Sequence, residues 1–363
     1  MQIYDFNLNS LSYKNGSYGG AAGNKDGILI NGEEWLLKYP ANLSSFEGKN
    51  ASYSTAPLSE YIGSHIYEIL GFDVHETLLG EKNGKIVVAC KDFATEKMLL
   101  EIRTLKNHPG KELEVLLEGS SIDSKETHVV DLEKLLMHID KNPLLSNVKG
   151  IKQRFFEQAV IDIFINNNDR NNGNWGILRE KGQEDCLAPI FDNGASFSKN
   201  MAEDKIIRLL NSSELTNNAI NVLTAYGEGE HQYSAKTFMK KVENIPEYQL
   251  AITNLVPKIQ KNLSAICKMI DEIPFTYQTS QKKELLVMSY ERKELYKKQV
   301  ELRLEKLLVP ELERITCREK SLCETSIAER FNAADLKAKE YTEKTQKGLK
   351  EFKNKSCKEN IEL

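Results

Sequence analysis

Residues 158–197 of the chain read QAVIDIFINNNDRNNGNWGILREKGQEDCLAPIFDNGASF. The apolar run 160–165 ends in the Asn-rich segment 166–174, whose side chains bond their own backbone and disfavour regular structure. After a second apolar segment, a short strand-like run ends in Asp192-Asn193-Gly194. This pattern predicts a polar loop set between buried elements, with a second polar turn after the next strand.

Three polar side chains in this stretch have the spacing of a metal–phosphate site. Asp169 and Asn174 lie on the predicted loop, and Asp192 follows it. Phosphoryl transfer needs a carboxylate to receive the proton of the attacking hydroxyl, and an Asn and an Asp to hold Mg²⁺ against the phosphates. The order D-x-x-x-x-N and then D-x-G fits this requirement, and oxygen ligands suit Mg²⁺. The competing interpretation is a surface turn with an unrelated hairpin turn, but two motifs in the correct order favour the site.

The first 95 residues are predicted to form mostly strands with one helix. A Gly-rich segment that includes Gly16, Ser17, Tyr18, Gly19 and Gly20 follows the first strand. Its backbone N–H groups could approach phosphates closely. The segment matches neither G-x-G-x-x-G nor the Walker A pattern, so a plain hairpin loop is the alternative.

Lys38 lies two strands further on. Gly27 to Ile30 is predicted to form a return strand, and Asn31-Gly32 predicts a hairpin leading into a third strand, 34–39. A lysine inside this apolar strand either extends to solvent at a sheet edge or reaches phosphates, as the lysine of the third strand does in kinases. The downstream loop favours the second interpretation.

A helix is predicted over 57–71, with apolar residues at helical spacing and Gly71 at its C-terminal end. Glu60, near its start, is the preferred partner for Lys38, and Glu68 is the competing candidate. Glu60 could also be an ordinary solvated glutamate on the helix surface.

The remaining pattern predicts two strands around Asn83-Gly84, then mainly helices. The strands are expected at 72–79 and 86–90, and the helices at 99–105, 113–117, 132–139, 151–165 and 284–308, with Pro310 interrupting the last one. Residues 195–213 fit either an activation-type segment or an ordinary loop.

Composition excludes several classes of protein. The 363 residues are 40% hydrophobic and 28% charged with a net charge of −4, which indicates a globular protein and gives no reason to expect nucleic acid as a partner. The six Cys and six His are dispersed without zinc-ligand spacing, which favours reduced thiols. No signal peptide or membrane-spanning run is evident, so we expect cytoplasmic synthesis, with signal-independent export as an open alternative.

The segments NNNDRNNGNWG and PIFDNGASF resemble the HipA-like serine/threonine kinases, which share their fold with the phosphatidylinositol 3- and 4-kinases. The resemblance covers roughly residues 10–309. It implies that Asp169 is the catalytic base, that Asn174 and Asp192 bind Mg²⁺, and that Lys38, oriented by Glu60, holds the ATP phosphates.

Two departures from the family pattern are visible. Asn171 stands where the family usually has His, and only about a dozen residues precede the Gly-rich segment, so an antitoxin partner is not expected. The family also implies autophosphorylation in the phosphate loop, where Ser17 is the analogous hydroxyl with Tyr18 beside it.

We therefore predict an α+β, two-lobed protein-kinase-like fold: a β-rich lobe at 1–93, a helical lobe at 94–309 and a charged tail at 310–363. Between 337 and 358 the tail carries eight Lys against three Glu, either as a solvated tail or as a basic interaction arm. The expected function is ATP- and Mg²⁺-dependent phosphorylation of protein hydroxyls, with a role as an exported bacterial effector on host signalling as an extension. The alternatives are a phosphatidylinositol-type lipid kinase, and a nucleotide-binding pseudokinase or adaptor that acts through the tail.

Overall fold

The computed structural model describes residues 1–12, 25–43, 53–117 and 129–318. Residues Met1–Glu311 form one compact unit and Leu312–Leu363 form a second. All elements named below belong to the first unit. The predicted lobe boundary near residue 93 stays a prediction, and the Gly-rich segment and most of the Lys-rich tail lie outside the described residues.

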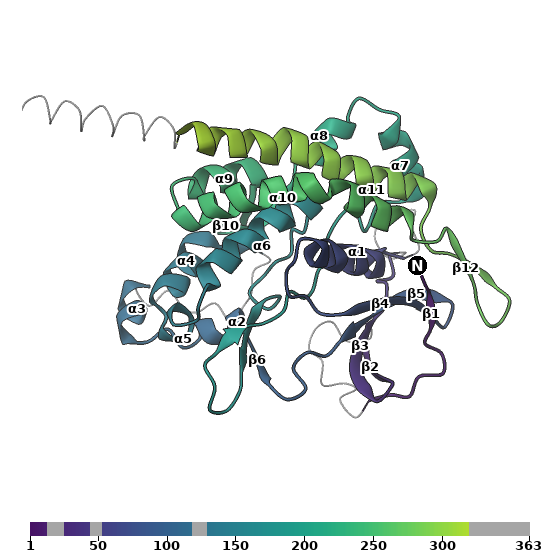
Figure 1. The fold of residues 1–363 in the computed structure, drawn as a ribbon, viewed down its shortest axis with the longest axis horizontal. Coiled ribbons are helices and arrows are strands. Elements are labelled where there is room, and N and C mark those ends of the chain that lie inside the picture. The colour runs from purple at the N-terminus through teal and green to yellow at the C-terminus, as the bar shows by residue number, and fades with distance from the viewer. Residues whose placement is uncertain (13–24, 44–52, 118–128, 319–363) are drawn as a thin grey trace, which may run out of the picture. The chain divides into compact units, whose positions relative to one another are not determined.

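A five-stranded sheet forms the amino-terminal part, in the order β1-β4-β5-β3-β2 (Figure 1). Its strands are β1 (Tyr4–Asp5), β2 (Lys25–Ile30), β3 (Glu33–Lys38), β4 (Thr77–Lys82) and β5 (Lys85–Lys91). β1 pairs with β4 in parallel, and the other neighbours are antiparallel. The hairpins turn at Asn31-Gly32 and Asn83-Gly84, where all four residues have positive φ. That is the type I′ geometry that Asn-Gly sequences favour, so both predicted turns are confirmed.

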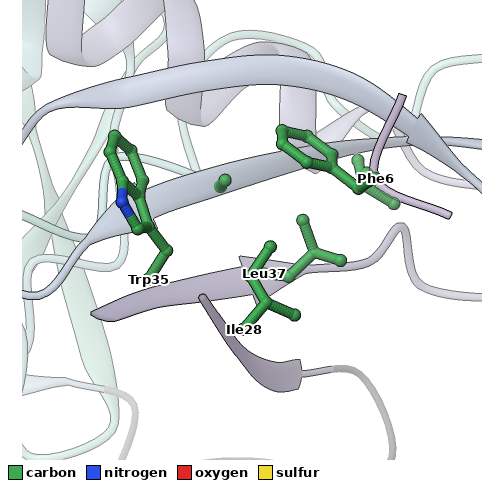
Figure 2. Close-up of a cluster of buried hydrophobic side chains, with 6 residues drawn as sticks. Phe6, Ile28, Trp35 and Leu37 are labelled. Atoms are coloured by element: carbon green, nitrogen blue, oxygen red, sulfur yellow. The ribbon is translucent and has the colours of Figure 1, made fainter. Parts of the chain in front are cut away.

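One face of this sheet carries a hydrophobic cluster, shown in Figure 2: Phe6, Ile28, Trp35, Leu37, Val87 and Ala89, each at most 2% exposed. Successive side chains of a strand point to opposite faces. Lys38 therefore lies on the other face from Leu37, where its cross-strand partner is Val88. Strand alternation thus places the lysine on the face opposite the cluster.

Helix α1 (Ala56–Ile69) packs against β4 and β5 on one side and against α10 on the other (Figure 1). Pro57 lies in its first turn, and Gly71, with φ 73°, follows its C-terminal cap. The predicted helix is confirmed, and it connects the sheet to the helical part.

The rest of the first unit is mainly helical (Figure 1). Its helices are α2 (Ile102–Lys106), α3 (Lys111–Leu116), α4 (Leu132–Lys141), α5 (Pro143–Ser146), α6 (Ile151–Ile165), α7 (Glu203–Leu210), α8 (Leu215–Ile220), α9 (Ala235–Val242), α10 (Pro246–Asp271), α11 (Tyr290–Arg303) and the π-helical turn η1 (Leu304–Leu308). α6 packs against α10, and α11 against α7 and α8. The buried α6 has the bounds predicted for it.

Three small sheets accompany these helices. Their strands are β6 (Met98–Glu101), β8 (Gly176–Arg179) and β9 (Cys186–Leu187) in the first, β7 (Val130–Asp131), β10 (Leu223–Glu228) and β11 (His231–Ser234) in the second, and β12 (Thr276–Gln278) and β13 (Glu284–Leu286) in the third.

Several predicted boundaries are wrong. The first half of the helix expected at 99–105 is strand β6, because it pairs with β8. The start of the helix expected at 284–308 is strand β13, which pairs with β12, and α11 begins at Tyr290 after its cap Ser289. The strand expected at 72–79 begins only at Thr77. Pro310 does not end the helix, since residues 309–311 are helical. Within the described residues, no helix combines the length and the apolar character needed to cross a bilayer.

Candidate active site

The catalytic-type loop begins where α6 ends. Asn166, in the left-handed conformation with φ 57°, caps that helix, a conformation that Asn tolerates better than most residues. The side chain of Asn174 donates to the Asp169 carbonyl oxygen at 2.5 Å. Asn171 donates through Nδ2 to Asp169 Oδ1 at 3.1 Å and accepts from the Gly173 N–H at 2.8 Å. The Asn found in place of the family's His therefore both contacts the Asp169 carboxylate and closes the loop.

Lys38 bridges two carboxylates that come from distant parts of the chain. Its Nζ lies 2.7 Å from Glu60 Oε2 on α1 and 2.9 Å from Asp192 Oδ1. The side chain of Glu60 is 1% exposed and that of Asp192 is 36% exposed. Glu68 is 66% exposed, and its Oε2 lies 3.9 Å from His65 Nε2. The structure thus brings Lys38, Glu60 and Asp192 together and places Glu68 on the surface.

Opposite charges set the ionisation of this group. Burial alone would lower the pKa of Lys38, but the charges of Asp192 and Glu60 outweigh it and raise that pKa well above its ordinary value. Burial works to raise the pKa values of Glu60 and Asp192, yet the Lys38 ammonium holds both below their ordinary values. All three side chains are therefore charged at neutral pH.

The second oxygen of Glu60 joins α1 to the D-N-G segment. Glu60 Oε1 accepts from the Asn193 N–H at 2.9 Å and lies 3.0 Å from His75 Nε2. Asn193 also donates to Ser64 Oγ at 3.0 Å. A Cβ added to Gly63 would lie 2.8 Å from the Asn193 Cβ, so the close approach of the helix depends on this glycine.

Arg170 joins the loop to the same segment from the other side. Its guanidinium, 1% exposed, makes a bidentate contact with Asp162 of α6 at 2.9 and 3.0 Å. It also donates to the carbonyl oxygens of Asn174 (3.0 Å) and Phe191 (2.5 Å) and to Asn193 Oδ1 (2.6 Å). One buried cation therefore fixes the loop and the D-N-G segment relative to each other.

The donor set suits a hard divalent cation. Asn174 Oδ1 and Asp192 Oδ2 accept no hydrogen bond from the described residues, since the contacts above use Asn174 Nδ2 and Asp192 Oδ1. An amide oxygen and a carboxylate oxygen are ligands that Mg²⁺ accepts while it keeps several waters. Asn174 and Asp192 could therefore hold Mg²⁺.

The site contains residues that the motifs did not single out. Asp162, Arg170 and Asn193 form its buried framework, and His75 supports Glu60. A charged Asp162 inside the apolar run of α6, eight residues before Arg170, is a sequence signal for a buried ion pair. His75 and Asn193 carry no comparable signal. The predicted phosphate contacts Gly16 to Gly20 lie outside the described residues.

Comparison with known proteins gives two strong similarities. No family model matches the chain. The serine/threonine-protein kinase CtkA of Helicobacter pylori is 33% identical over 281 residues, covering 76% of this chain and 81% of the relative. The crystal structure of that proinflammatory kinase matches with a TM-score of 0.72 and 29% identity, over 87% of this chain and 99% of the other.

The HipA toxin of Shewanella oneidensis MR-1, solved with HipB and operator DNA, matches more weakly, with a TM-score of 0.46 and 14% identity over 81% of this chain and 66% of that one. The match to CtkA confirms the predicted kinase-like α+β fold.

Proposed function

The chain belongs to the family of serine/threonine protein kinases that includes CtkA, and we propose that it transfers the γ-phosphoryl group of ATP, with Mg²⁺, to serine or threonine hydroxyls of proteins. The observation that carries the proposal is the contact of Lys38 with both Glu60 and Asp192. In kinases this lysine–glutamate pair and the D-x-G aspartate must be in place together.

Each side chain has a role in this proposal. Lys38 would bind the α- and β-phosphates, and Glu60 would keep the ammonium in position. Asn174 and Asp192 would hold Mg²⁺, which would neutralise negative charge on the γ-phosphoryl group that ATP supplies. Asp169, with its carboxylate oriented by Asn171, would receive the proton of the attacking hydroxyl.

A transfer assay with radiolabelled γ-phosphate tests this proposal. Wild type, Asp169→Asn, Asp192→Asn and the control Asp185→Asn would be incubated with Mg-ATP and myelin basic protein, followed by phosphoamino-acid analysis. Asp185 is a carboxylate of the same region that pairs with Arg179 outside the site. We expect phosphoserine or phosphothreonine with wild type and control only, and loss of label when EDTA removes the metal.

Two other outcomes would contradict the proposal. Equal label with Asp169→Asn and Asp192→Asn would place the chemistry elsewhere. ATP binding without any transfer to protein would favour the lipid-kinase or the adaptor interpretation, which phosphatidylinositol vesicles and a tail-deletion binding assay separate.

Autophosphorylation and an effector role extend the proposal. CtkA is a proinflammatory kinase, and the similarity to it supports an effector role here. Mass spectrometry of protein incubated with Mg-ATP would show phosphate on Ser17 in wild type and none in Asp169→Asn. Purified protein applied to host epithelial cells would raise cytokine output, and Asp169→Asn would not.

A further inference from the structure

A cavity of about 660 Å³ lies beside the start of α1. Residues before and in the first turn of α1, the β4–β5 turn, the start of α7 and the segment from β13 to α11 form its walls. None of Lys38, Glu60, Asp169, Asn174 or Asp192 lines it. The cavity is therefore separate from the candidate active site. Its size is within the range of about 300–1,000 Å³ that is typical of pockets for small organic ligands.

The inner wall of the cavity is apolar. Pro40, Pro57, Leu58, Val287 and Met288 line it and are buried. Two further lining residues, Tyr53 and Leu286, are 43% and 50% exposed. An apolar ligand body would cover side chains that now contact water, and this burial favours binding.

The charges in the wall are unevenly compensated. Arg292 pairs with Glu203 through two nitrogens and also donates to the Met201 carbonyl oxygen. Asp204 pairs with Arg208. Lys85, which lies over the Tyr53 ring at 5.0 Å from its centroid, has no carboxylate partner among the described residues.

Lys85 is thus the lining cation whose charge is not balanced within the described part of the wall. An anionic group at the end of an apolar ligand would complement it.

The cavity and the candidate active site lie on opposite faces of the same helix. Leu58 lines the cavity, and Glu60 contacts Lys38. Residues two positions apart in an α-helix point about 200° away from each other around the helix axis. Thr55, another lining residue, donates its N–H and its hydroxyl to the Lys199 carbonyl oxygen at 2.8 and 3.1 Å. The cavity therefore touches both the helix that carries Glu60 and the segment that follows Asp192.

We propose that this cavity binds a long-chain carboxylate, with the chain against the apolar wall and the carboxylate at Lys85. Its occupancy biases the position of α1, and so the contact between Glu60 and Lys38. Only this regulatory part rests on the proposed function; the binding site itself does not.

The test uses the full chain and the fluorescent fatty acid cis-parinaric acid, whose emission rises in apolar surroundings, with dodecanoate and its uncharged analogue dodecanol as competitors. We expect saturable binding that dodecanoate displaces more effectively than dodecanol. Lys85→Glu and Leu286→Asp should each weaken binding by about tenfold or more, equivalent to about 1.4 kcal/mol.

Matched controls exist for both variants. Lys181→Glu reverses the charge of an exposed lysine in another turn, and Leu223→Asp alters a half-exposed strand leucine outside the cavity. Both should bind as wild type does, and all four variants should keep the wild-type melting temperature. Non-saturable binding of the probe, or an equal loss of affinity in the test and control variants, would refute the proposed binding site.

Asp169→Asn, which cannot transfer phosphate in our proposal, should still bind the probe, so failure of the kinase function would leave this result intact. In that variant, saturating dodecanoate should change the Kd for ATP, and ATP should change the Kd for dodecanoate by the same factor. Unchanged ATP affinity would refute the regulatory role.

Discussion

Replacement of Arg170 by Met tests whether one buried cation holds the candidate active site together. Met keeps an unbranched apolar stem and removes the guanidinium together with its charge. The variant leaves Asp162, 4% exposed, without its cationic partner. It also removes the donors to Asn174, Phe191 and Asn193.

The structure sets the expected size of the effect. Breaking a buried ion pair by removing one partner costs about 3–5 kcal/mol, because a desolvated charge remains. Asp162 would keep hydrogen bonds from the Tyr67 hydroxyl and the Asn167 amide, at 3.0 and 3.2 Å. We therefore expect a loss near the lower end, about 3 kcal/mol, against a total stability of roughly 5–15 kcal/mol.

Urea unfolding followed by circular dichroism measures this loss, and the chain offers a matched control. Arg179 makes the same two-nitrogen contact with Asp185 at 2.9 and 2.6 Å, but its side chain is 42% exposed. Arg179→Met should cost no more than about 1 kcal/mol. Adding Asp162→Asn to Arg170→Met should recover part of the stability, because the unpaired charge is removed.

Two results would refute this reasoning. Equal losses for Arg170→Met and Arg179→Met would show that burial does not amplify the contact. No recovery on adding Asp162→Asn would show that the unpaired carboxylate is not the source of the loss.

Three further predictions concern ionised groups. Glu60→Gln should lower kcat/KM for ATP by about 10- to 150-fold in steady-state kinetics, the equivalent of one charged hydrogen bond of about 1.5–3 kcal/mol. The same change leaves the largely buried Lys38 ammonium with one carboxylate fewer, so the melting temperature should fall as well. Lys38→Met removes the cation that lowers the pKa values of Glu60 and Asp192. Without it, these carboxyls can take up protons when the pH falls. In urea unfolding, the loss of stability relative to wild type should therefore be larger at pH 7 than at pH 4. Burial and the charge of Lys106 lower the pKa of His138 from 6.5 to about 4. As the pH falls, the unfolded chain therefore binds a proton at this residue before the folded protein does. Stability in urea unfolding should fall between pH 6.5 and 4, and it should fall less in His138→Asn.

The sequence predicted best those elements whose signals are local. Both Asn-Gly turns, α1 and α6 follow from turn chemistry and helical periodicity. The wrong boundaries lie where hydrogen bonding to another strand determines the secondary structure. Leu99 to Glu101 and Glu284 to Leu286 have helix-compatible residues, but each segment lies beside a strand partner that a local pattern does not reveal.

The candidate site divides in the same way. Motif spacing predicted Asp169, Asn174 and Asp192 as site residues, and the position of Lys38 in the third strand predicted the lysine. The sequence favoured Glu60 over Glu68 as the partner of Lys38, and the structure shows that contact, with Glu68 exposed on the same helix. The role of Asn193 could not be predicted, since its partners Ser64, Glu60 and Arg170 are distant in sequence.

The backbone of Asp192 shows why these polar contacts matter together. Asp192 has φ 59°, a left-handed conformation that costs a non-glycine residue about 1–2 kcal/mol. Both of its neighbours are fixed: Arg170 binds the Phe191 carbonyl oxygen, and the Asn193 N–H donates to Glu60. The chain on either side of Asp192 is therefore held by buried bonds that offset this cost. Because Glu60 in turn binds Lys38, the folding of the framework itself positions the carboxylate of Asp192 at the ammonium.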